Sequence, residues 1–279
     1  MLTCLNNATI GAASFEGFLE AAHIAGFAAI EVGVGSLEEY VAKHSLMTLA
    51  DELRRKGLVF GSGGLPLDWR APDETFRHDL EALPSRLKLC RQLSLMRLCT
   101  WIPPRWDKPY VEVFAFARER FRAVAETLAP YEISLGLEFV APQGGFLDKR
   151  YKFITTLAEV LHLIEAIGCD NVGLLLDSYH LFVGETPMAE LAALAASRIV
   201  QFHINDAYPA VPREELQDLK RALPGEGAIP LVPMLLALKS TGYNWTISVE
   251  SFNEEVKALG PVEAAKRTKA SLDAILSVL

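Results

Sequence analysis

The chain has 279 residues, of which 51% are hydrophobic and 22% charged, and its formal net charge is −8. This composition is typical of a globular protein, and the acidic balance argues against nucleic-acid binding, because phosphate contacts require a basic surface. The amino-terminal segment lacks the basic stretch and apolar core of a signal peptide, and no apolar run reaches the roughly 20 residues of a membrane helix.

Short apolar runs alternate with helical patterns along the whole chain. The runs are continuous in Leu, Ile, Val and Gly rather than alternating with polar residues, as expected of parallel strands covered on both faces. We predict eight strands, at Leu2–Asn6, Ala28–Val34, Val59–Gly63, Met96–Trp101, Ile133–Phe139, Val172–Asp177, Ile199–Ile204 and Thr246–Glu250.

Helical patterns separate these strands, and several carry start and stop signals. SLEE at Ser36–Glu39 and TLAE at Thr156–Glu159 predict capping boxes, in which a hydroxyl and a carboxylate bind the free amides of a helix start. Helices are predicted at Ser14–Ala25, Pro109–Leu128, Thr156–Ile167, Pro230–Thr241 and Val262–Leu279.

This alternation predicts an α/β fold, a (β/α)₈ TIM barrel with a parallel eight-stranded sheet, in one domain spanning residues 1–279. The alternative is an open doubly wound sheet, but no GxGxxG follows the first strand. Cys4, Cys90, Cys99 and Cys169 are scattered without a CxxC pair, which predicts reduced core thiols in a cytoplasmic protein.

Each of the last four predicted strands ends on a metal-type ligand, namely Glu138, Asp177, His203 and Glu250. The carboxyl ends of barrel strands carry the catalytic residues, and adjacent strands lie about 4.8 Å apart, so these side chains can surround one ion. Three carboxylates and one imidazole suit Mn²⁺, Mg²⁺ or Co²⁺, and Zn²⁺ is compatible. The alternative is a set of solvated acids at the barrel mouth.

Other polar and aromatic residues are expected near the same face. His180 follows Asp177 by three residues and should lie outside the metal's ligands, where it can bind substrate or move a proton. Trp101 ends strand four and Trp69 lies in the loop after strand three. Their rings can pack against the C–H side of a sugar, and the alternative for Trp101 is that it fills the barrel top. Asn6 can hydrogen-bond a substrate hydroxyl. The glycines of PGEGAI, Pro224–Ile229, permit a tight turn, and Glu226 within it either contacts substrate or faces solvent.

The segments LGLEFV, DNVGLLLDSYH, FHINDA, LPGEGAIPL and ISVESF resemble the xylose-isomerase-like barrel family of sugar isomerases and epimerases, and the likeness covers nearly the whole chain. The resemblance implies that Glu138, Asp177, His203 and Glu250 hold the metal. It also implies that His180 contacts the substrate and that Glu138, Glu250 or both move protons.

The chain departs from patterns of this family at three positions. Gly144 and Pro209 stand where the ketohexose 3-epimerases carry an acid and an arginine, and Asn205 replaces the lysine of a HIKD segment that is frequent in the family. The substrate contacts made by those groups are therefore not expected here.

The resemblance implies a metal-dependent isomerase or epimerase that abstracts a proton beside a ketone through a metal-stabilised enediolate. A dehydratase of the inosose or 3-dehydroshikimate type is the alternative, and a metal-binding barrel without turnover is a third reading. We expect an unphosphorylated polyol ketone or sugar as substrate, although Arg105, Arg150 and Arg213 lie in active-face loops and can grip a phosphate. No nucleic acid or membrane is expected as a partner, and the sequence leaves self-association into a homo-oligomer open.

Overall fold

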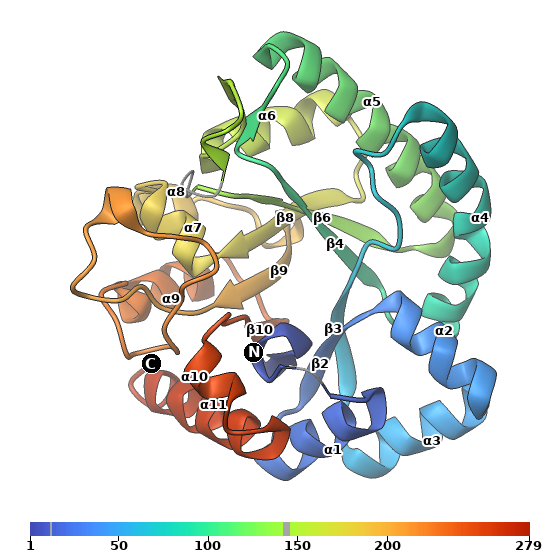
Figure 1. Cartoon of the computed structure of the whole chain (residues 1–279), viewed down its shortest axis with the longest axis vertical. Coiled ribbons are helices and arrows are strands. Elements are labelled where there is room, and N and C mark those ends of the chain that lie inside the picture. Colours follow the sequence, from blue (N-terminus) through green and yellow to red (C-terminus); the bar gives the residue numbers. More distant parts are fainter. Residues whose placement is uncertain (12, 142–145) are drawn as a thin grey trace.

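Eight parallel strands close into a barrel, as the sequence predicts. The computed structural model describes residues 1–11, 13–141 and 146–279. Each strand pairs with its predecessor along the chain, and the last pairs in parallel with the first, which closes the sheet (Figure 1). The strands are β1 (Leu2–Asn6), β2 (Ala29–Gly33), β3 (Val59–Gly64), β4 (Arg97–Ile102), β6 (Ser134–Phe139), β8 (Val172–Asp177), β9 (Ile199–Ile204) and β10 (Thr246–Val249).

The helices surround the barrel and bury their apolar faces against it (Figure 1). They are α1 (Phe15–Ala25), α2 (Val34–Lys43), α3 (Leu46–Lys56), α4 (Asp73–Gln92), α5 (Tyr110–Leu128), α6 (Leu157–Ile167), α7 (Ser178–Val183), α8 (Met188–Ala192), α9 (Leu231–Ser240), α10 (Glu254–Lys257) and α11 (Pro261–Leu276). Short 3₁₀ turns occupy Asn7–Thr9, Ala129–Tyr131, Ala196–Arg198 and Arg213–Glu215.

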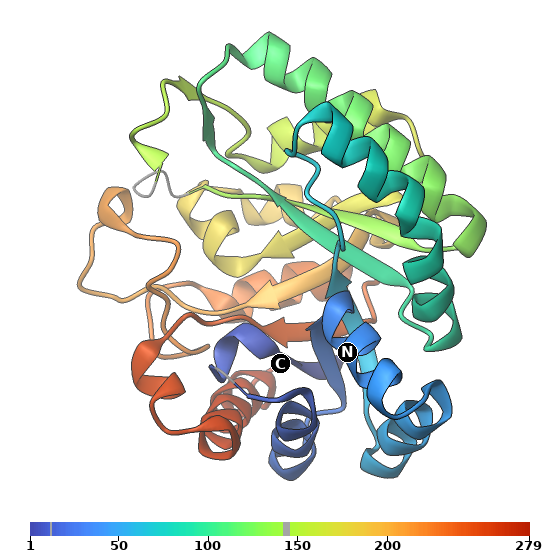
Figure 2. The ribbon, with the colours of Figure 1, turned by 45° about the vertical axis from the view of Figure 1, so that its right-hand side comes forward.

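The helices at the two ends of the chain lie side by side. Figures 1 and 2 both show α1 next to α11, at the point where β10 meets β1. The ring of helices therefore closes where the barrel closes. Within the part of the chain described here, no helix has the length and apolarity needed to cross a membrane.

Two helix starts test the predicted capping boxes. At α6 the Thr156 side chain accepts from the Glu159 amide and Glu159 accepts from the Thr156 amide, so this box is confirmed. The box predicted at Ser36–Glu39 is wrong. The chain passes from β2 into α2 without a loop, and the helix starts at Val34, so Ser36 comes too late to act as its cap.

A small structure that the sequence did not predict lies at the carboxyl end of the barrel strands. β5 (Arg105–Trp106) and β7 (Tyr151–Lys152) form an antiparallel pair from the loops after β4 and β6. Strands of two residues leave no periodic signal in a sequence. All four cysteines are free thiols, and Cys4, Cys90 and Cys99 are buried.

Candidate active site

Four side chains meet at the carboxyl ends of neighbouring strands. Glu138 comes from β6, Asp177 from β8, His203 from β9 and Glu250 directly follows β10, and one ligand atom from each lies within 4.8 Å of the others. Asp177 and His203 are register partners across β8 and β9. The structure thus brings together the four residues that the sequence singled out, in a group we call the carboxylate cage.

The chemistry of the cage fits a divalent cation. The Oε1 atom of Glu138 and the Nδ1 atom of His203 are buried and make no hydrogen bond. Nδ1 lies 3.4 Å from Oε2 of Glu250 and 3.9 Å from Oδ2 of Asp177. Three oxygen donors and one imidazole nitrogen are ligands that Mn²⁺, Co²⁺, Mg²⁺ and Zn²⁺ accept, and an ion among them would satisfy both unpaired atoms.

The two glutamates of the cage lie in different electrostatic environments. Burial, together with the negative charges of Glu250 and Asp177, raises the pKa of Glu138 well above its usual value. Burial acts in the same direction on Glu250, but the positive charges of His203 and Arg221 outweigh it and lower the pKa of Glu250. Without a metal, Glu138 therefore holds a proton more readily than Glu250 does.

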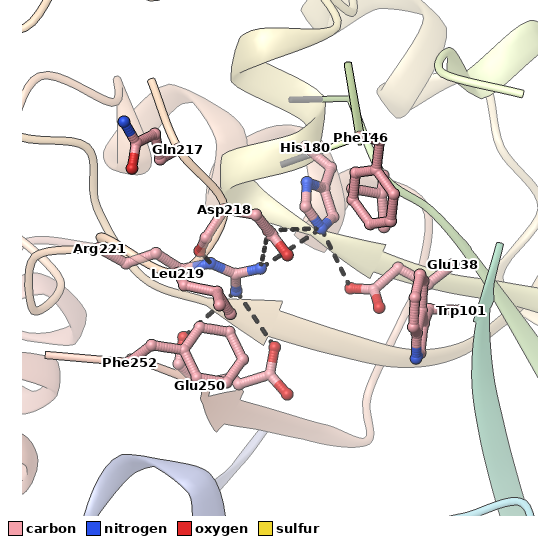
Figure 3. Close-up of a pocket in the computed structure, with 11 residues that line it drawn as sticks. Trp101, Glu138, Phe146, His180, Gln217, Asp218, Leu219, Arg221, Glu250 and Phe252 are labelled. Carbon is pink, nitrogen blue, oxygen red and sulfur yellow. Dashed lines mark hydrogen bonds and ion pairs between the residues drawn. The ribbon is translucent and has the colours of Figure 1, made fainter. Parts of the chain in front are cut away.

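A buried arginine that the sequence reading missed joins the cage to its surroundings. Arg221 lies in the loop between β9 and α9, and its Nη1 atom donates to Asp177 Oδ2 at 2.9 Å and to Glu250 Oε2 at 3.1 Å. Its Nη2 atom donates to Asp218 Oδ1 at 2.6 Å, and the guanidinium stacks on Phe252 (Figure 3). This loop is irregular and gave no periodic signal; the nearest clue was the PGEGAI motif that begins three residues later.

His180 sits beside the cage, outside the group of four. Asp177 caps α7 by accepting from the backbone amides of Tyr179 and His180, and this contact places the imidazole. Its Nε2 atom lies 3.3 Å from Nη2 of Arg221 and 3.7 Å from Oε1 of Glu138. Burial lowers the pKa of His180. Because a guanidinium can only donate, Nε2 accepts, and the neutral ring carries its proton on Nδ1.

A cavity of about 580 Å³ opens beside the cage. Glu138, His180, Asp218, Arg221 and Glu250 are the charged and titratable side chains of its lining (Figure 3). Apolar side chains lie between and beside them, namely Trp101, Val140, Phe146, Leu219 and Phe252. A second cavity, of about 310 Å³, is also lined by Glu138, His203 and Glu250, so the cage is reached from both.

The aromatic candidates are placed differently from one another. Trp101 is 37% exposed and lines both cavities, and the guanidinium carbon of Arg70 lies 4.5 Å from the centroid of its ring. Trp69 is 1% exposed and packs against Phe121, 4.5 Å between ring centroids. The expectation that Trp69 can reach a substrate is wrong, because the loop after β3 turns this ring inward beneath α5.

The polar candidates outside the cage serve mainly to hold it. Asn6 donates to Glu250 Oε1 at 3.3 Å and accepts from the amide of Ala8 at 2.9 Å. Asn205, in the place of the family lysine, donates to Asp177 Oδ2 at 2.9 Å. Contact of Asn6, Trp101 and His180 with a substrate stays a prediction.

The loop candidates lie away from the cavities. Glu226 is exposed and pairs with Arg267, so it faces solvent. Arg105 donates to the backbone carbonyls of Lys149 and Arg150, and Arg213 forms an ion pair with Glu185. Pro209 is exposed, and Gly144 lies outside the described residues.

The chain thus forms a closed parallel barrel with an acidic cage and a cavity at the carboxyl ends of its strands, the end at which barrels of this fold carry their active sites. The chain belongs to the xylose isomerase-like TIM barrel family, whose family model matches residues 19–277.

Similar proteins of known activity act on sugars and cyclitols. The inosose isomerase of Bacillus velezensis is 28% identical over 283 residues, covering 99% of this chain and 98% of the relative. A D-psicose 3-epimerase of Enterocloster bolteae is 22% identical over 251 residues, covering 86% of this chain and 77% of the relative.

Solved structures repeat the same fold over the whole chain. A xylose isomerase domain protein from Alicyclobacillus acidocaldarius has a TM-score of 0.92 and 31% identity, covering 99% of this chain and 98% of its own. The IOLI protein, crystallised with a bound zinc atom, has a TM-score of 0.84 and 25% identity, with the same coverage.

Proposed function

We propose that this protein is a divalent-metal-dependent isomerase or epimerase of a sugar or cyclitol ketone, with an inosose as the first candidate substrate. The observation that carries the proposal is the pair Glu138 and Glu250, which enter from different strands and point toward each other beside one cavity (Figure 3). The similarity to inosose isomerases and to a ketose epimerase supports the same reaction class.

The reaction exchanges a proton on the carbon beside the ketone. A divalent ion, when bound by Glu138, Asp177, His203 and Glu250, supplies Lewis-acid stabilisation of the charge that develops on the ketone oxygen. One glutamate removes the proton from the carbon beside the ketone; the other returns a proton to the same carbon in an epimerase, or to the former carbonyl carbon in an isomerase. His180 lines the cavity with its Nε2 atom held by Arg221, and contacts the substrate from that position.

The cavity favours an unphosphorylated substrate. Among the described residues that line it, the cationic side chain is Arg221, and its two terminal nitrogens already contact Asp177, Glu250 and Asp218. A phosphate group would meet carboxylates without a free positive charge to balance it. The apolar side chains of the lining, Trp101 among them, can instead pack against the C–H face of a substrate ring.

Isotope exchange tests the proposal directly. Protein loaded with Mn²⁺ or Co²⁺ is incubated in D₂O with an inosose, ketohexoses and hydroxypyruvate, and deuterium on the carbon beside the ketone is measured by NMR and mass spectrometry. We expect exchange with retention of the carbon skeleton. Glu250→Gln should slow it by about 10²-fold or more, because the amide keeps the shape but cannot act as a base.

Two controls separate the roles of the residues. Metal content is measured in every variant, since Glu250→Gln also removes a ligand. His180→Ala should keep the metal but lose most turnover, whereas loss of the metal would make His180 a ligand. Accumulation of an ultraviolet-absorbing enone would instead show a dehydratase, and no exchange with any substrate by the loaded protein would refute enolisation.

A further inference from the structure

A buried carboxylate that the proposed reaction does not use lies behind the metal-type histidine. Glu31, on β2, is 7% exposed, and its Oε1 and Oε2 atoms lie 3.0 and 2.9 Å from Nε2 of His203. β1 and β10 separate β2 from β9 in the barrel, so this contact crosses the barrel interior. The pairing of β2 with β3 shifts register between Ile30 and Glu31, an irregularity of the kind that redirects a side chain.

The neighbours of Glu31 fix the direction of its hydrogen bonds. Oε1 of Gln201 accepts from the backbone amide of Phe202 at 3.1 Å and from Oγ1 of Thr246 at 2.6 Å. The amide group of Gln201 is therefore oriented, and its Nε2 atom donates to Ser62 Oγ at 3.0 Å and toward Glu31 Oε2 at 3.4 Å. Because Glu31 accepts this N–H, its carboxyl group acts as a hydrogen-bond acceptor here. His203 therefore donates the proton on its Nε2 atom to Glu31.

The two nitrogens of His203 thus face opposite surroundings. Nε2 is occupied by Glu31, whereas Nδ1 makes no hydrogen bond and belongs to the carboxylate cage. Metal-bound histidines commonly donate their second N–H to a carboxylate, which fixes the tautomer and makes the ring a better ligand.

We propose that Glu31 is a positioning residue of the metal site: it holds the proton of His203 on Nε2 and so commits Nδ1 to the ion. This inference rests on the proposed metal site, but it assigns a role to a side chain that is not one of the four ligands. Gln201 and Ser62 keep Glu31 in place and form the next layer of the same arrangement.

Metal affinity tests the role without reference to turnover. The dissociation constant of Co²⁺ is measured by chelator competition on metal-free wild type, Glu31→Gln and Asp218→Asn. Glu31→Gln should weaken binding by about 10- to 100-fold, because the amide is a poorer acceptor and no longer fixes the tautomer. Asp218→Asn is the matched control, since it removes a half-buried carboxylate beside the cage that does not touch His203, and its effect should be smaller.

A spectroscopic signature on the wild type keeps the test independent of how the variants fold. In the Co²⁺-loaded protein, proton NMR should show one strongly shifted, solvent-exchangeable resonance from Nε2–H of His203, protected because Glu31 accepts it. Absence of that resonance would overturn the proposal. A dissociation constant of Co²⁺ in Glu31→Gln equal to that of the wild type, or equal to that of Asp218→Asn, would overturn it as well.

The outcomes distinguish this inference from the proposed function. Metal binding that depends on Glu31, in a protein that exchanges no substrate proton, would leave the inference standing and refute the isomerase. Substrate proton exchange by the wild type, together with metal binding by Glu31→Gln that equals wild type, would support the isomerase and refute the role of Glu31. A wild type that binds no divalent ion would refute both.

Discussion

Arg221 brings a positive charge into the centre of an acidic site. Its side chain is 1% exposed and contacts Asp177, Asp218 and Glu250. These charges repel one another, and together they raise the pKa of Arg221 well above its usual value even though burial opposes this. The arginine therefore balances part of the charge that a metal ion would otherwise have to neutralise alone.

Replacing Arg221 with methionine should destabilise the metal-free protein by about 3–5 kcal/mol, because it leaves buried carboxylates without a partner. Unfolding in urea, followed by circular dichroism, measures this change. Saturating Mn²⁺ should recover a large part of the loss, since the ion supplies positive charge at the same oxygens.

Arg213→Met provides the matched control for this loss. Arg213 forms a solvent-exposed ion pair with Glu185, and its removal should change the free energy of unfolding by less than about 1 kcal/mol. Equal effects of the two substitutions would show that Arg221 is not a structural counter-ion of the cage.

Protons compete with the metal at two of the four ligands. Burial acts to lower the pKa of His203, but the charges of Glu31 and Glu250 and the hydrogen bond to Glu31 outweigh it and raise this pKa well above its usual value. The pKa of Glu138 is raised as well. Both shifts favour the protonated forms in the metal-free protein, and a divalent ion must displace those protons to bind.

Metal binding should therefore release more than one proton and weaken as the pH falls, by roughly tenfold per pH unit for each proton displaced. Calorimetric titration with Mn²⁺ between pH 6 and 8, in buffers of different ionisation enthalpy, counts these protons. His180→Ala should release the same number, because the lowered pKa of His180 keeps that ring neutral. Binding that does not change with pH would contradict the assignment of His203 and Glu138 as ligands.

Asp206 holds the loop that carries Arg221 in place. Asp206 follows β9 and accepts four backbone amides: those of Ala207 and Ile229 on Oδ1, and those of Gly225 and Gly227 on Oδ2. The PGEGAI turn is thus folded around a carboxylate. Gly227 is required there because a Cβ would lie 2.2 Å from the Ala207 carbonyl.

Asp206→Asn should destabilise the protein by roughly 2–4 kcal/mol, since one oxygen becomes an NH₂ group and two amides lose their acceptor. Thermal unfolding measures the loss, and proton exchange on the substrate measures whether Arg221 and Asp218 are displaced with the loop. Unchanged stability would show that the turn holds its shape without the carboxylate.

The barrel as a whole was predictable because buried parallel strands are continuous apolar runs. The boundaries of β1, β8 and β9 match the prediction, and Glu138, Asp177, His203 and Glu250 were found because each interrupts or ends such a run. Glu31 left a similar signal, a carboxylate between Ile30 and Val32 inside a predicted strand, which the sequence reading did not use.

Arg221 and Asp218 could not be found in this way. They lie in an irregular loop, and their place beside the cage depends on how that loop folds around Asp206, a tertiary contact without a local pattern. The early start of α2 likewise depends on how the chain leaves β2, so a motif match at Ser36 was misleading.

The position of Glu250 has a consequence for how the protein assembles. It directly follows β10, the strand that pairs with β1 to close the barrel, whereas Glu138, Asp177 and His203 come from strands that precede it. Before β10 pairs with its neighbours, the chain can present only Glu138, Asp177 and His203 to an ion. Glu250 becomes the fourth ligand when β10 pairs and the sheet closes. The visible absorption of bound cobalt would therefore report barrel closure during refolding. The rate at which the ion is released would report the opening of the barrel.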